Sequence, residues 1–152
     1  MDLPLIHHGA LVLVGDGEKA IFLRNVGNGN LKLSVERVLE QDNPKNREQG
    51  TDRPGRKPGS DGVSMSSVGE TDWHQLAEDR FTDVISKALF RLAHDQAFQE
   101  LIVVAPPKVL GRLRESMHKE VTDRITAEIP KELTMHTVPD IEKALKAMQS
   151  LQ

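Results

Sequence analysis

The sequence predicts an α/β fold in which helices pack on one mixed five-stranded sheet. Its first forty residues hold three strand-like stretches separated by turn signals, which is typical of an antiparallel meander. After residue 72, helical and strand-like stretches alternate, and this order favours parallel strands joined by right-handed crossovers. With 152 residues and no internal repeat, the chain is expected to form a single domain over residues 1–152.

Three strands are expected in the first forty residues. ALVLV (Ala10–Val14) is a continuous apolar run that suits a strand buried on both faces, and Asp16-Gly17 after it favours a tight hairpin turn. KAIFLRNV (Lys19–Val26) is the second strand, and the third follows another glycine-rich turn. In the third strand the apolar positions alternate with polar ones and are expected to share one face: Leu31, Leu33 and Val35.

The remaining predicted elements follow residue 72. Trp73–Ala93 has apolar residues at helical spacing, and Leu101–Ala105 has the pattern of a buried strand that two prolines end. Pro107 and Pro139 each suit the first turn of a helix, and Ile125–Ile129 alternates as a fifth strand. The apolar stripe of the long helix is Ala77, Phe81, Val84, Ile85, Ala88, Leu89 and Leu92. The expected order is therefore β-β-β-α-β-α-β-α.

The predicted elements leave a gap at residues 41–72, which we expect to be a long, mobile, basic loop. Structureless connections of this length are uncommon in compact domains and are usually functional or disordered. Between Pro44 and Ser60, five cations and two carboxylates give a net charge of +3 in a chain whose total is -3. This local charge suits phosphate contacts, although it is also typical of a plain solvated connection.

Composition excludes several classes of protein. The chain has no cysteine, which excludes disulfides, thiol nucleophiles and zinc–thiolate sites. Its first residues have no basic leader and no apolar run of membrane-spanning length, so we expect a cytoplasmic protein without a membrane partner. The histidines lack the i, i+4 spacing of a helical zinc site, and the first strand lacks the carboxylate of a two-metal nuclease. We therefore expect neither a metal nor a cofactor.

APPKVLGRLR (Ala105–Arg114) is a second candidate site for anions. A strand runs into the N-terminus of a helix here, where free N–H groups and the helix dipole favour negative charge. Lys108 and Arg112 add positive charge close to this terminus. The segment is therefore expected to form a secondary anion patch.

Four segments in this order resemble one known family: GTDRPGR (Gly50–Arg56), WHQLAEDRF (Trp73–Phe81), LIVVAPPKVLGRLR (Leu101–Arg114) and EIPKELT (Glu128–Thr134). It is the bacterial host-attachment protein family, which is similar to the middle domain of archaeal and eukaryotic peptide-release factors and of the ribosome-rescue protein Pelota. The resemblance implies a mixed five-stranded sheet with a helical cover. It also implies a ribosomal partner, because the loop after the third strand of release factors carries a Gly-Gly-Gln motif that helps water attack the peptidyl-tRNA ester.

This chain contains no Gly-Gly-Gln, so release activity does not carry over, and Gln49 beside Gly50 is the one candidate for a catalytic side chain in the loop. We expect instead a translation-linked role in which the loop binds the ribosome or structured RNA, with no DNA partner. The alternative is a protein-interaction or regulatory module with an indirect effect on host attachment. A steep loss of binding with salt distinguishes RNA from such a module. The expected contact set is Lys45, Arg47, Gln49, Gly50, Arg53, Gly55, Arg56 and Lys57.

Overall fold

The computed structural model describes residues 3–41 and 59–149, with side chains of the long helix from residue 72 onward. Its strands are β1 (Leu11–Gly15), β2 (Lys19–Asn25), β3 (Leu33–Glu40), β4 (Leu101–Val104) and β5 (Ile125–Ile129). Its helices are α2 (Gly59–His94), α3 (Pro107–Ser116), α4 (Lys119–Thr122) and α5 (Val138–Gln149). The α/β fold class is confirmed, and the described elements add only the four-residue α4 to the predicted order.

The five strands form one mixed sheet in the order β3-β2-β1-β4-β5. β2 pairs antiparallel with both β1 and β3, which confirms the predicted meander. β4 pairs parallel with β1 and with β5, as the alternation of strands and helices predicts. The chain reaches these parallel neighbours through α2 and through α3 with α4.

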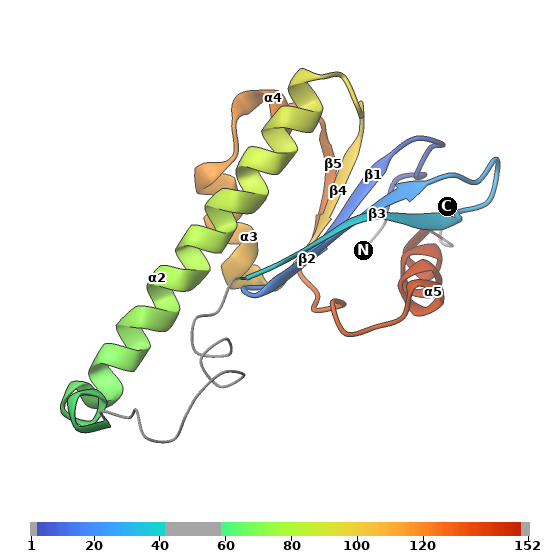
Figure 1. Cartoon of the computed structure of the whole chain (residues 1–152). Coiled ribbons are helices and arrows are strands. Elements are labelled where there is room, and N and C mark those ends of the chain that lie inside the picture. Colours follow the sequence, from blue (N-terminus) through green and yellow to red (C-terminus); the bar gives the residue numbers. More distant parts are fainter. Residues whose placement is uncertain (1–2, 42–58, 150–152) are drawn as a thin grey trace.

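Both faces of the sheet are covered by helices (Figure 1). On one face, α2, α3 and α4 pack over a core that includes Leu13, Phe22 and Val103. On the other face, α5 and the N-terminal segment pack over a second core that includes Val12 and Ile102. Neighbouring residues of β1 thus enter different cores, which explains why ALVLV is continuously apolar.

α2 is longer than predicted, because it begins at Gly59 and not at Trp73. Residues 59–72, which were expected to belong to the basic loop, therefore form the first turns of this helix. The sequence has no proline between Gly59 and Ala105 that would end a helix, and the scattered glycines and serines concealed the continuation. Figure 1 shows that this first part of α2 extends beyond the sheet.

β3 is an edge strand, and its burial differs from the prediction. Leu31 and Leu33 are buried as expected, but Val35 is 44% exposed. The register between β2 and β3 shifts at Phe22/Leu23, so that Phe22 pairs with Arg37 and Leu23 with Val35. The α5 contact is made at the start of β3, where the backbone N–H of Leu33 donates to Glu142 Oε2 at 2.6 Å. The rest of the strand has no helix over it, which is why its alternation does not end in burial.

Candidate functional site

The edge of the sheet at the carboxyl end of β1 fixes the point where residues 42–58 leave the described fold. The backbone N–H of Gln41 donates to the Glu18 carbonyl at 2.8 Å, and Gln41 Nε2 donates to the Gly17 carbonyl at 3.2 Å. A Cβ on Gly17 would lie 2.9 Å from Glu78 Oε2, so the turn can approach α2 this closely only with a glycine. The basic segment is thus attached beside α2.

Carboxylates at this edge are occupied by contacts within the protein. Asp16 Oδ1 accepts from the backbone N–H groups of Glu18 and Lys19, both at 2.7 Å, which closes the predicted β1–β2 turn. The buried Thr134 hydroxyl lies 2.6 Å from Asp16 Oδ2 and 2.5 Å from Glu132 Oε1. Within residues 3–41 and 72–149, no group of three histidine or carboxylate side chains is arranged to hold a metal. Asp16 therefore acts as a turn residue at this edge.

Arg112 has a different role from the expected one. Its Nη1 lies 2.7 Å from Glu78 Oε1 and its Nε lies 3.1 Å from Asp79 Oδ1, and its side chain is only 15% exposed. The guanidinium group joins α3 to α2 and has its charge balanced by two carboxylates, so it is not open to an external anion. Lys108, the other member of the expected secondary anion patch, is exposed. The patch is thus reduced to a single lysine.

Residues 9–145 match bacterial archaeo-eukaryotic release factor family 12. The chain belongs to this family. The resemblance to a release-factor-related bacterial family is therefore confirmed, and it extends over nearly the whole chain. The family assignment brings with it neither host attachment nor an RNA partner.

Individual relatives of the family 12 chain are distant or partial. A 55-residue stretch is 36% identical to the uncharacterized protein RP470 of Rickettsia prowazekii (strain Madrid E), and it covers 36% of this chain and 37% of that protein. The archaeal translation termination factor aRF1 and a second solved archaeal protein are each 12% identical, with TM-scores of 0.48 and 0.46. The likeness covers 93% of this chain in both cases, but only 39% and 38% of those chains.

The expected RNA contact set of this family 12 chain lies outside the described residues. This applies to Lys45, Arg47, Gln49, Gly50, Arg53, Gly55, Arg56 and Lys57. The structure fixes only the two points between which they lie, Gln41 beside the β1–β2 turn and Gly59 at the start of α2. Among the helices of the described parts, none is long and apolar enough to cross a membrane.

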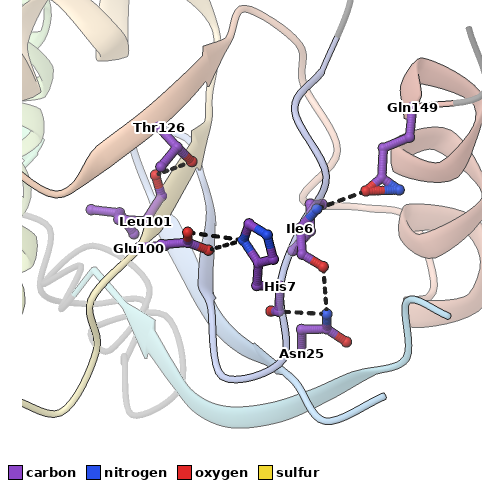
Figure 2. A network of polar contacts seen from close by, with 7 residues as sticks. All are labelled: Ile6, His7, Asn25, Glu100, Leu101, Thr126 and Gln149. Atoms are coloured by element: carbon purple, nitrogen blue, oxygen red, sulfur yellow. Dashed lines mark hydrogen bonds and ion pairs between the residues drawn. The ribbon is translucent and has the colours of Figure 1, made fainter. Parts of the chain in front are cut away.

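Sequence reasoning missed a second polar region, at the amino ends of β1 and β4 (Figure 2). His7 Nδ1 lies 2.9 Å from both carboxylate oxygens of Glu100, beside a hollow of about 360 Å³. Asn25 Nδ2 donates to the carbonyls of Ile6 and His7 at 3.0 and 3.1 Å, so the N-terminal segment is held on the sheet. The adjacent pair His7-His8 was the available signal, but spacing along the chain does not reveal a partner 93 residues away.

Proposed function

We propose that this protein has a translation-linked role in which its basic segment binds the ribosome or structured RNA. Membership of a release factor family over residues 9–145 carries this proposal, because the family name places its relatives in translation termination. Release activity of the Gly-Gly-Gln type is not part of the proposal, since the sequence lacks that motif.

The charge distribution along the chain supports RNA as the partner. The stretch from Pro44 to Ser60 has a net charge of +3, although the chain as a whole has a charge of -3. Arginine is the main contributor, and its guanidinium group offers paired N–H donors that fit phosphate oxygens. The acidic remainder of the protein would repel a polyanion, so binding has to begin at this segment.

Co-sedimentation with ribosomes at low and moderate salt tests the proposal. The loop variant replaces Arg47, Arg53, Arg56 and Lys57 with glutamine, and the control variant replaces Lys32, Lys131, Lys143 and Lys146 in the same way. Both variants lose four positive charges, so they have the same net charge. We expect only the loop variant to lose binding, and its remaining binding to depend less on salt, by a log–log slope of up to roughly 3 at about 0.7 per phosphate contact. Equal sedimentation of the two variants would contradict the proposal.

Peptidyl-tRNA hydrolysis is tested separately, with Gln49→Ala. A ribosome-binding role that does not use Gln49 predicts the same ribosome affinity for this variant and for the wild type. The measurement is release of a labelled peptide from ribosome-bound peptidyl-tRNA alongside the sedimentation assay. A release rate that falls with Gln49→Ala would show that the loop is catalytic.

A further inference from the structure

The outward face of α2 carries large apolar side chains that no other element covers. Trp73, Leu76 and Val84 are 42%, 44% and 48% exposed. They lie opposite the side of the helix that packs on the sheet, where Phe81 and Ile85 are buried. The sequence pattern had predicted that Val84 belongs to the core, so its exposure is a correction. The fold does not account for these outward side chains through packing.

Cations lie on the same outward face. Arg80, Lys87 and Arg91 are separated by seven and four residues, which is close to whole turns of a helix with 3.6 residues per turn. Among the residues whose side chains are described, no carboxylate forms an ion pair with these three. The guanidinium carbon of Arg80 lies 5.9 Å from the centre of the Trp73 ring, so this cation extends over an aromatic face.

Two adjoining hollows lie beside these cations, and both are lined by Lys87 and Phe90. The larger, of about 500 Å³, also has Arg91 and His94 in its wall, and the smaller, of about 220 Å³, is completed by His118 and neighbouring polar residues. The Phe90 ring lies 5.5 Å from the ring of His94 and 4.4 Å from that of His118. A cluster of aromatic rings is thus bordered by two positive charges.

We propose that this outward face of α2 binds a short run of unpaired RNA nucleotides. Bases stack on Trp73 and on Phe90, and phosphates contact Arg80, Lys87 and Arg91. The combination of stacking rings with a row of cations is the arrangement by which proteins bind single strands without sequence preference. The inference rests on the proposed function, because it names the form of RNA that the protein recognises beyond its basic segment.

Length and chemistry favour a single strand over other polyanions. Trp73 and Phe90 are 17 residues apart, which corresponds to about 25 Å along a helix and is enough for several nucleotides. Duplex RNA hides its base faces within the stack, so it offers nothing to the two rings. An acidic peptide satisfies the cations but has no flat bases for the rings to contact.

Trp73 provides a direct measurement of binding, because it is the only tryptophan in the chain. We expect its fluorescence to be quenched in a saturable way by an unstructured RNA of about 12 nucleotides, a length within the usual site sizes of single-strand binders. Duplex RNA of the same sequence and an acidic peptide serve as competitors. Quenching that either competitor reproduces at the same concentration would overturn the assignment to single-stranded RNA.

Variants identify the face, with anisotropy of a labelled RNA as the measurement. Phe90→Leu and Trp73→Leu keep apolar bulk and remove a stacking ring, so each is expected to weaken the affinity by about 5- to 150-fold. Lys87→Gln with Arg91→Gln is expected to reduce the log–log salt slope by about 1.4. Lys143→Gln with Lys146→Gln on α5 is the control with the same charge change, and it is expected to bind as the wild type does. Trp73 is exposed, so its variant remains informative even if Phe90→Leu fails to fold.

The outcomes separate this inference from the proposed function. If the α2 and α5 double variants bind the single strand alike, the α2 site is wrong, whether or not the loop variant still loses ribosome binding. If the α2 double variant alone loses affinity, the site is supported, even where the loop variant sediments like its own control. Failure of the wild type to bind any single strand overturns the inference directly.

Discussion

The two faces of α2 differ in what surrounds them. The inward face places Phe81, Ile85 and Leu89 in the core that α3 and the sheet complete. The outward face leaves Trp73 and Leu76 partly in water, although these side chains are just as apolar. Stability explains the first set through burial, but it does not explain the second. The outward residues are therefore the ones to test for binding, and the inward ones for folding.

Leu89→Ala and Leu76→Ala test this comparison most directly, because they make the same chemical change on opposite faces of one helix. Leu89 is fully buried, so its truncation is expected to lower the free energy of unfolding by about 2–5 kcal/mol. Leu76→Ala is expected to change it by no more than about 0.5 kcal/mol, since a half-exposed surface position leaves no cavity. Urea unfolding measures both, and similar losses in the two variants would mean that the outward face is packed after all.

Two arginines extend the comparison to charged residues. Arg24 Nη1 donates to the carbonyls of Gly9 and Ala97 at 3.0 and 2.8 Å, and its other nitrogens contact Glu36 at 2.9 and 3.0 Å. Arg24→Ala leaves both carbonyls without this charged donor, so we expect it to lower the free energy of unfolding by about 1.5–3 kcal/mol. Arg91→Ala, on the outward face of α2, is expected to change stability by less than about 0.5 kcal/mol.

Hydrogen exchange distinguishes a local from a global effect of Arg24→Ala. The carbonyl of Ala97 belongs to the connection between α2 and β4, so exchange in that connection is expected to accelerate first. Unchanged protection there, together with unchanged stability, would show that Arg24 does not hold the two segments together.

Patterns along the sequence predicted most of the sheet because each strand has a local signature. β1 and β4 are buried on both faces and read as continuous apolar runs, and Asp16-Gly17 marks the turn between β1 and β2. Burial of β3 was only partly predictable, since alternation identifies a wetter face but does not show whether a helix covers the other. Val35 lies beyond the reach of α5, and no local signal records the position of a helix a hundred residues later.

The candidate site was less predictable than the fold, because it depends on partners that are distant in the sequence. The charge of Arg112 was visible, but its two carboxylates lie on α2, more than thirty residues earlier. Trp73 was expected to anchor a helix start, and it lies instead in mid-helix on an exposed face. The expectation for the loop cations stays a prediction, since they are outside the described residues.

Arg112→Gln tests whether this residue joins two helices or binds anions. As a link between α3 and α2 at a partly exposed position, it is expected to contribute about 1 kcal/mol to the free energy of unfolding, and less at high salt. Ribosome and RNA affinity are expected to stay unchanged, in contrast with the loop variant. Arg80→Gln on the outward face is the control, with no effect on stability. A loss of RNA affinity without a loss of stability would restore Arg112 to the anion patch.

Asp83→Asn is expected to have the smallest effect, and in the opposite direction. Asp83 is an exposed carboxylate in the wall of the smaller hollow, on the same side of α2 as Lys87. It repels any phosphate that contacts this lysine, so its neutralisation is expected to raise the affinity for single-stranded RNA by about 2- to 5-fold, the equivalent of about 0.3–1 kcal/mol. Stability is expected to stay the same.

Asp140→Asn on α5 is the matched control for Asp83→Asn, because it makes the same change of net charge on the opposite face of the sheet. Anisotropy of the labelled RNA is compared for the two variants at two salt concentrations. If both raise the affinity equally, the gain comes from net charge alone and the outward face of α2 has no special role. If only Asp83→Asn does so, the phosphate lies close enough to α2 to sense a single carboxylate, because charges farther apart than the Debye length of about 8 Å are screened at physiological salt.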